Sequence, residues 1–277
     1  MTASARRIDH LVLAVHDLDA AASFYERLGF QVGVRNRHPW GTENRLVQFQ
    51  SSFLELITVG KDAEIAPHGP RFFSFGAFVR DYLARREGLA MLVLDSTDAR
   101  NDAARFAEAG IGDYEPFFFE RKGRRPDGSE THVSFTLAFA TDPHLPEASF
   151  FVCQQHFPEA FWNPDLQSHA NGAADVSAVM LSVEHPPVHT SFLKAFSGAA
   201  NEGEGSFFAL KNGSKLQVVA GEDASGFTAF RVRVPDLTVV KTKLSEEQIA
   251  FHEAKDYVAV ASPHLGVTIQ FEKNIVF

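Results

Sequence analysis

The sequence predicts an α+β protein made of four βαβββ modules, because one order of strands and helix recurs four times along its 277 residues. Each copy opens with an apolar strand, turns at polar residues and continues as an amphipathic helix followed by short strands. The fourth copy, "FRVRVPDLTVV", even repeats the pattern of valine, one residue, aspartate and leucine found in "LAVHDLDAAA". Such internal repetition indicates an array of similar structural units.

The first module spans about residues 8–60. "IDHLVLAV" is an apolar strand, and the helix that follows it has Asp17 or Asp19 in position to cap its amino end. Gly29 supplies the left-handed residue that commonly ends a helix. Three strands are then expected, at residues 30–35, 45–49 and 53–59.

The remaining modules follow the same order at about residues 89–156, 175–220 and 226–273. In the third module, Asn212 and Gly213 predict a tight hairpin turn. The segment between the second and third modules is rich in Pro, Asn, Gly and His, which is typical of a linker. The sequence therefore predicts two halves, residues 1–168 and 169–277, with two modules in each.

Composition limits the classes of function. Lys plus Arg number 26 and Asp plus Glu 35, so the net charge is 26 − 35 = −9, which disfavours binding to nucleic acid or to an anionic membrane surface. Cys153 is the only cysteine, so no internal disulfide can form. Without a signal-peptide pattern or a long apolar span, we expect a cytoplasmic protein.

Two compositional features leave alternatives open. The basic segment "ERKGRRPDG" at 120–128 predicts a solvated hairpin loop or, as the alternative, an anion-binding loop. Phenylalanine is unusually frequent, with 27 residues against 4 Tyr and 2 Trp. Such a number favours aromatic core packing, and an apolar cavity lined by Phe is the other interpretation.

Several motifs resemble a known superfamily. "IDHLVLAV", "FYERLGF" and the glutamate in "FLELI" resemble the vicinal oxygen chelate superfamily of glyoxalase I, bleomycin-resistance proteins and extradiol dioxygenases. "HPWGTENRLVQF", "FFVCQQHFPEAFWNP" and "HANGA" resemble, more narrowly, bacterial glyoxalase-like domain proteins. The resemblance implies that modules pair into two open, cupped half-barrels, each around a ligand site. In much of the superfamily that site holds a divalent metal.

The resemblance implies that His10 and Glu55 lie on neighbouring strands of one cup. An imidazole and a carboxylate can together bind Zn²⁺, Ni²⁺, Fe²⁺ or Mn²⁺, and His132 or His156 of the second module could complete the shell. The alternative is a metal-free pocket in which the two polar side chains bond each other.

Alignment of the modules places the site in the first half. The positions of His10 are taken by Leu89, Ala178 and Ala229, and those of Glu55 in the third and fourth modules by Gln217 and Gln270. Ring cleavage of the extradiol type in the second half is therefore disfavoured. We expect this half to be structural or to form a homodimer.

Substrate contacts are predicted from polar and aromatic residues near these strands. "RHPWGTENR" offers His38, Trp40, Asn44 and Arg45, with an ordinary β connection as the alternative interpretation. Gln154 and Trp162 are further candidates, although Trp162 could equally be an interdomain plug.

Two functions remain open at this stage. The first is a divalent-metal-dependent lyase or isomerase of glyoxalase type, in which Glu55 moves a proton on a small carbonyl or hydroxy compound. The second is a binding protein of bleomycin-resistance type that sequesters a small molecule without chemistry.

Overall fold

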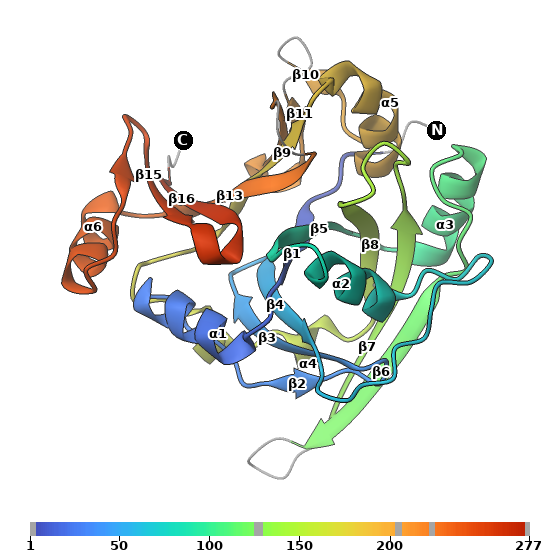
Figure 1. Cartoon of the computed structure of the whole chain (residues 1–277), viewed down its shortest axis with the longest axis horizontal. Coiled ribbons are helices and arrows are strands. Elements are labelled where there is room, and N and C mark those ends of the chain that lie inside the picture. The colour runs from blue at the N-terminus through green and yellow to red at the C-terminus, as the bar shows by residue number, and fades with distance from the viewer. Residues whose placement is uncertain (1–3, 125–129, 203–206, 222–224, 275–277) are drawn as a thin grey trace.

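The computed structural model describes residues 4–124, 130–202, 207–221 and 225–274. Its strands form two sheets (Figure 1). The N-terminal sheet consists of β1 (Ile8–Ala14), β2 (Asn36–Arg37), β3 (Thr42–Gln48), β4 (Phe53–Val59), β5 (Gly88–Asp95), β6 (Phe117–Arg124), β7 (Glu130–Ala140) and β8 (Ser149–Gln155). The C-terminal sheet consists of β9 (Asp175–Val183), β10 (Asn201–Glu202), β11 (Phe207–Ala209), β12 (Lys215–Ala220), β13 (Gly226–Val234), β14 (His252–Glu253), β15 (Tyr257–Ser262) and β16 (Val267–Lys273).

The helices are α1 (Leu18–Arg27), α2 (Phe75–Leu83), α3 (Ala99–Glu108), α4 (Pro158–Phe161), α5 (Pro186–Ser197) and α6 (Leu237–Glu246), with short 3₁₀ turns at Pro164–Gln167, Lys211–Gly213 and Pro263–Leu265. The helices α1, α3, α5 and α6 each follow the opening strand of a module, as the repeat predicts, whereas α2 and α4 lie in connections that the repeat does not include. No helix within these described ranges is both long and apolar enough to cross a membrane.

The two sheets have the same strand order. It runs β2, β3, β4, β1, β5, β8, β7, β6 in the first sheet and β10, β11, β12, β9, β13, β16, β15, β14 in the second. In each sheet the opening strands of two modules pair antiparallel, and each opening strand pairs in parallel with the closing strand of its own module. The predicted α+β class with four βαβββ modules in two cupped sheets is confirmed.

Local signals for helix and turn act as expected. The carboxylate of Asp17 accepts hydrogen bonds from the amides of Asp19 and Ala20 at the start of α1, and Gly29 has a φ of 90° just after its end. Asn212 and Gly213 both have positive φ in the connection between β11 and β12, as a tight hairpin requires.

The strand expected at residues 30–35 is wrong. This segment has no ladder of its own; the amide of Gly33 donates one bond to the carbonyl of Leu46. Apolar residues alternate with polar residues or glycine from Phe30 to Val34, but only Phe30 and Val32 are buried in the core, and Val34 is exposed. Side-chain burial thus imitates the strand period without strand pairing.

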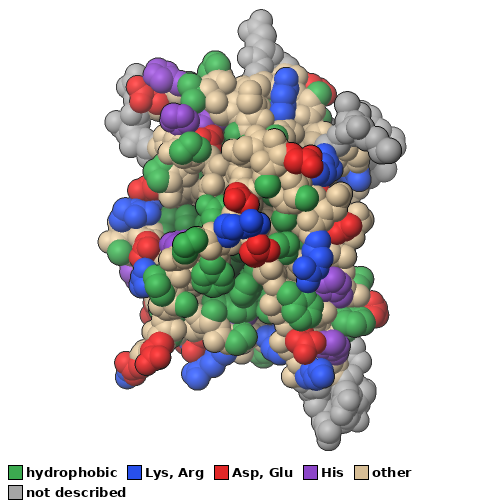
Figure 2. Space-filling model, turned by 90° about the vertical axis from the view of Figure 1, so that its right-hand side faces the viewer, with side chains coloured by type: hydrophobic (Ala, Val, Ile, Leu, Met, Phe, Trp, Pro, Cys, Tyr) green, Lys and Arg blue, Asp and Glu red, His purple; other side chains and the backbone are tan. Residues whose placement is uncertain are grey.

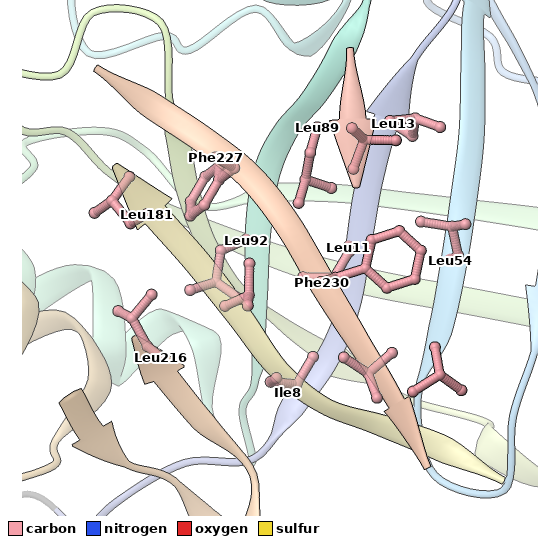
Figure 3. Packing of buried hydrophobic residues seen from close by; sticks show 14 of the residues in the cluster. Ile8, Leu11, Leu13, Leu54, Leu89, Leu92, Leu181, Leu216, Phe227 and Phe230 are labelled. Carbon is pink, nitrogen blue, oxygen red and sulfur yellow. The ribbon is translucent and has the colours of Figure 1, made fainter. Parts of the chain in front are cut away.

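One hydrophobic core lies between the two sheets. Leu11, Leu13 and Leu54 of the N-terminal sheet meet Phe227 and Phe230 of the C-terminal sheet (Figure 3), and all five are at most 1% exposed. Burying this apolar surface is the main driving force for joining the halves. The opposite face of the N-terminal sheet is therefore left to form a separate cup.

The helix α2 covers that cup. It belongs to a long connection, residues 60–87, between the first two modules, and it packs against β1 and β4. Ser74 caps it through the amide of Ala77, and Phe75, Phe78 and Tyr82 turn toward the sheet. The N-terminal cup, which we define as this face of the N-terminal sheet, thus acquires an apolar cover.

On the face in Figure 2, basic and acidic side chains are interspersed around a group of hydrophobic side chains. Residues 120–124 of the basic segment form the end of β6 and pair with β7, so this part of the expected loop is strand. The rest of the segment, residues 125–128 with Arg125, lies outside the described residues.

Candidate functional site

The N-terminal cup holds a cavity of about 190 Å³. Residues of β1, β3, β4, the β6–β7 hairpin, β8 and α2 form its walls. The walls are rich in aromatic side chains, with Phe53, Phe75, Phe119, Phe135, Phe151 and Phe161. The frequent phenylalanines thus serve both interpretations, because others such as Phe150, Phe196 and Phe230 fill the core between the sheets.

Glu55 brings a carboxyl group into this apolar cavity. It lies on β4 and is 6% exposed. The side-chain amide of Asn44, on the adjacent strand β3, donates a hydrogen bond to Oε1 of Glu55. Burial raises the pKa of the Glu55 carboxyl above its ordinary value of 4.5, while His10 and the bond from Asn44 act in the opposite direction. A carboxyl group in this position takes up a proton more readily than a solvated one.

His10 faces the same carboxyl group. Its Nε2 lies 3.9 Å from Oε2 of Glu55, and its ring stacks on Phe53 with 4.2 Å between centroids. Its Nδ1 lies 2.7 Å from Oδ2 of Asp9, which is fully buried. The other oxygen of Asp9 accepts a bond of 2.8 Å from the amide of Gln155.

A β-bulge explains how consecutive residues meet on one side of the sheet. Along the pairing of β1 with β5, Ile8 faces Leu94 and His10 faces Val93, so Asp9 has no partner residue. A bulge of this kind redirects a side chain, and bulges are frequent beside active sites. Regular alternation places Asp9 and His10 on opposite faces, which is why the sequence did not reveal Asp9.

His38 approaches Glu55 from the connection between β2 and β3. Its Nε2 lies 3.9 Å from Oε1 of Glu55, its Nδ1 lies 2.8 Å from the hydroxyl of Thr42, and its ring stacks on Trp40 at 4.4 Å. Burial, with a smaller effect from the charge of Arg121, lowers the pKa of His38 to about 3. The imidazole of His38 is therefore neutral at ordinary pH.

Two polar atoms in the cavity walls lack a partner within the described part of the chain. They are Nε1 of Trp40, a donor, and Oδ1 of Asn44, an acceptor. Buried polar atoms normally have a hydrogen-bond partner, so such a pair indicates room for a ligand with complementary groups.

The structure brings some of the predicted site residues together and leaves others apart. His10, His38, Trp40, Asn44 and Glu55 all line the cavity. Trp162 lines an adjoining groove and lies 6.0 Å from the ring of Phe53.

Arg45 and Gln154 are engaged elsewhere. Arg45 donates to Asp19 at 2.8 Å and to the carbonyl of Gly33. Gln154 lies on the core-side face of β8, where it bonds the carbonyl of Thr97 and the amide of Ala99 at the start of α3. Neither residue lines the cavity.

The two histidines considered as additional metal ligands also have other partners. His132 contacts Glu120 at 2.8 Å, and His156 contacts the hydroxyl of Thr136 at 2.8 Å. Neither lies at the cavity wall. Within the described residues, no group of three or more His, Cys, Asp or Glu side chains is arranged to hold a metal ion.

Strand register identifies what the second module places opposite His10 and Glu55. Leu11 of β1 pairs with Leu92 of β5, and its counterpart Val179 of β9 pairs with Phe230 of β13. Leu92 and Phe230 are therefore equivalent, and so are the residues that precede them, Met91 and Ala229. The alignment of Leu89 with His10 is therefore wrong by two residues, because the repeat signal does not fix register across a bulge. By the parallel pairing of β5 with β8, the counterpart of Gln270 is Phe151.

This register decides how well a metal fits. A metal site with ligands from both modules needs donor atoms at Met91 and Phe151, the counterparts of His10 and Glu55. A thioether and a phenyl ring are poor ligands for the ions considered. The residues present do not fit a metal site completed by the second module. Glu55, with His10 and His38 at its two oxygens, is what remains.

Comparison with known proteins agrees with this architecture. A hypothetical protein from Staphylococcus aureus has a similar solved structure, with a TM-score of 0.69, 13% identity, and coverage of 97% of this chain and 99% of that one. The Mn(II)-bound glyoxalase from Novosphingobium aromaticivorans has a TM-score of 0.62 at 10% identity, with 98% of this chain and 83% of that one covered. A halotolerant catechol dioxygenase has a TM-score of 0.60 at 12% identity, with 98% of this chain and 87% of that one covered. No curated protein matches the chain.

These likenesses concern the fold, since all identities are low. The chain shares its fold with a glyoxalase and a catechol dioxygenase, two of the classes of protein that the motifs resemble. The model of the glyoxalase-like domain matches residues 8–197, which is more than half of the chain. The chain therefore belongs to the glyoxalase-like domain family.

Proposed function

We propose that the N-terminal cup is the active site of a lyase or isomerase that moves a proton on a small carbonyl or hydroxy compound through Glu55. The observation that carries the proposal is the setting of this carboxyl group, which is buried in an aromatic cavity where its pKa is raised. A carboxyl group tuned in this way exchanges protons closer to neutral pH than a solvated one.

The cavity walls support a ligand with an oxygen function. Nε1 of Trp40 can donate to a carbonyl oxygen, and Oδ1 of Asn44 can accept from a hydroxyl group. The aromatic walls accommodate the apolar part of the molecule. A ligand with both features satisfies the unpartnered atoms and fills the cavity at the same time.

The proposed step begins with ionised Glu55. Its carboxylate takes a proton from the carbon next to the carbonyl, the electron pair of that C–H bond forms a C=C bond, and the carbonyl electrons move to the oxygen. In a hydroxy compound, return of the proton from Glu55 to the former carbonyl carbon, with transfer of the hydroxyl proton to the former carbonyl oxygen, gives isomerisation. In a compound with a leaving group on the next carbon, the electron pair of the enolate expels that group while Glu55 keeps the proton, which gives elimination. His10, held by Asp9, faces Glu55 through Nε2 and can pass a proton to or from it.

A divalent metal would find the carboxylate of Glu55 together with Nε2 of His10 or of His38. One of the similar structures is a Mn(II)-bound glyoxalase, which makes metal a necessary variable in any assay. Because the second module contributes Met91 and Phe151, the proton step above is written for the side chains of this chain alone.

Exchange of hydrogen for deuterium tests the proposal directly. The purified protein is incubated in D₂O with 1-phenylpropan-2-one and with 2-hydroxy-1-phenylethanone, with chelator or with added Mn²⁺, Zn²⁺, Ni²⁺ or Fe²⁺, and loss of the C–H signal is followed by NMR. We expect exchange above the buffer rate in wild type and a loss of about 100-fold or more in Glu55→Gln. Glu272→Gln, on the closing strand of the C-terminal sheet, is the matched control and should behave as wild type.

The second candidate is a binding protein that sequesters a small molecule without chemistry. The observation in its favour is the apolar character of Met91 and Phe151 at positions that face the cup. Saturable binding of these ketones without exchange under any metal condition would favour this candidate. Equal exchange by wild type and Glu55→Gln would contradict the role of Glu55.

A further inference from the structure

We infer that the ligand of the N-terminal cup carries an anionic group, which Arg121 binds at the mouth of the cavity. The inference rests on the proposed function, since it concerns the same site, and it adds the charge and the orientation of the ligand. It rests on the connection of two hollows and on the charges that line them.

The cavity opens into a larger groove of about 630 Å³. Five residues line both spaces, and they form the passage between them: Asn36, Leu46, Arg121, Val133 and Phe161. Arg121 is the one basic side chain among them. A ligand longer than the inner cavity must therefore pass beside this guanidinium.

The other charged residues around the inner cavity are already paired. Arg37 bonds Glu43 at 2.9 Å, and Glu120 contacts His132 at 2.8 Å. Arg121 has no acidic partner among the residues that the structure describes. Arg121 is exposed by accessible area, and its charge still reaches the cavity, because it contributes to lowering the pKa of His38.

The orientation follows from the opposite end. Glu55 is buried and its pKa is raised, so an anion placed beside it would be repelled and would raise that pKa further. The anionic group therefore points outward to Arg121, and the apolar part lies among the phenylalanines next to Glu55. The groove also contains Glu159, which is exposed on α4, and this disfavours a second anionic group further out.

The chemistry that meets these conditions is a small carboxylate or phosphate ester with an aromatic or branched apolar body. The guanidinium forms two parallel hydrogen bonds with either anion, which makes arginine well suited to such recognition. Carboxylate and phosphate share this chemistry, and the two are separated by direct comparison of probes.

The experiment compares isosteric probes of different charge. Binding of 3-phenylpropanoate, 3-phenylpropanamide, 3-phenylpropylamine and 2-phenylethyl phosphate is measured by quenching of tryptophan fluorescence and by calorimetry. Both tryptophans of the chain, Trp40 and Trp162, line the two spaces, so the optical signal reports on the site. We expect at least one of the two anions to bind about tenfold or more tightly than the amide in wild type.

Variants of the hairpin identify the source of the preference. Arg121→Gln should weaken binding of the anion about tenfold and leave binding of the amide unchanged. Lys122→Gln removes the same charge from the next residue of β6, which does not line the cavity, and should leave both affinities as in wild type. Melting temperatures of both variants show whether folding is intact.

Each result decides between the inferences. Equal binding of anions and amide by wild type, or equal weakening of all probes in Arg121→Gln, overturns the anion inference and leaves the proposed function standing. Tighter binding of the amine overturns it as well and makes Glu55 the counter-charge. Failure of all four probes to bind contradicts both the inference and the proposed ligand site.

Discussion

The two sheets share strand order and register, yet they present different surfaces on their cup faces. In the N-terminal cup, His10 and Glu55 stand among phenylalanines beneath α2. In the C-terminal sheet, modules three and four are joined by residues 221–225, where modules one and two have the long connection that contains α2. The difference teaches that the core faces determine the fold and that the cup faces and the connections determine the site.

Register makes the comparison residue by residue. The four central cup positions of the N-terminal sheet and their counterparts in the C-terminal sheet are His10 with Ala178, Glu55 with Gln217, Met91 with Ala229, and Phe151 with Gln270. Next to Gln270, the guanidinium of Arg231 donates to Oε1 of Gln270 and contacts Glu272 at 3.2 Å. Polar residues that bond one another thus stand where the N-terminal cup has its aromatic walls.

The largest expected effect concerns packing. Phe151 is 1% exposed and contacts His10, Phe75 and Phe139. Phe151→Ala should therefore reduce the free energy of unfolding by about 3 to 5 kcal/mol. Its counterpart Gln270→Ala removes bonds to one half-buried arginine and should reduce it by about 1 kcal/mol or less. Urea denaturation of both variants measures the difference.

Equal costs for the two variants would contradict the comparison. A large cost for Gln270→Ala would mean that the C-terminal cup is also a packed core. A small cost for Phe151→Ala would mean that the N-terminal cavity is loosely packed and that its walls rearrange around a truncated side chain.

The sequence predicted the fold well because its signals are local or repeated. Caps such as Asp17, turns such as Asn212 with Gly213, and the four-fold pattern all act over a few residues. For the site, five of the predicted residues line one cavity, and their roles stay predictions: His10, His38, Trp40, Asn44 and Glu55.

What the sequence did not predict depends on register and on long-range contact. Asp9 reaches His10 only through a bulge, and a bulge leaves no clear signal in a single sequence. Gln154 was assigned to the pocket although strand alternation turns it to the other face of β8. The cover by α2 and the position of Arg121 at the cavity mouth require the folded chain.

The second prediction concerns Asp9. Its carboxylate holds Nδ1 of His10, which leaves Nε2 directed at Glu55. Asp9→Asn removes the charge that fixes this arrangement, so proton exchange should fall by about tenfold. The matched change at the corresponding position of β9, Ser177→Ala, should leave exchange intact.

Spectroscopy distinguishes a positioning role from a merely structural one. ¹⁵N NMR of the histidine rings should show a single tautomer of His10 in wild type and a mixture in Asp9→Asn. An unchanged tautomer with reduced exchange would assign the loss to altered packing and would contradict the positioning role of Asp9.

The third prediction concerns acid stability. The pKa of His38 is about 3 in the folded protein and 6.5 when unperturbed. Between these values the unfolded chain binds the proton and the folded chain does not, so stability falls as the pH falls from 6.5 toward 3. At pH 5 the loss from this residue is about 2 kcal/mol.

His38→Gln should remove the part of the fall in stability at acid pH that comes from His38. Unfolding by urea at pH 7 and at pH 5 gives the comparison, and the decrease between the two should be smaller in the variant by about 2 kcal/mol. Equal decreases in wild type and His38→Gln would show that the imidazole is hydrated in solution.

The smallest effect separates the two cups by charge alone. The pKa of Glu55 is raised in the folded protein, so the folded chain holds the proton more tightly than the unfolded chain. The stabilisation that the proton on Glu55 gives the folded state is fully present below the ordinary pKa of 4.5, and it is lost as the pH rises through the raised pKa. Glu55→Gln removes this loss while it preserves shape, so the variant should equal wild type in stability at low pH and exceed it at alkaline pH. The reciprocal change, Gln217→Glu, puts a carboxylate at a half-buried position of β12, where water solvates it, and should alter stability by less than about 0.5 kcal/mol at any pH.

Thermal melting of the three proteins from pH 4 to pH 9 provides the measurement. A constant difference across that range would show that Glu55 is not desolvated in the cup, and the contrast between the two halves would then rest on packing alone.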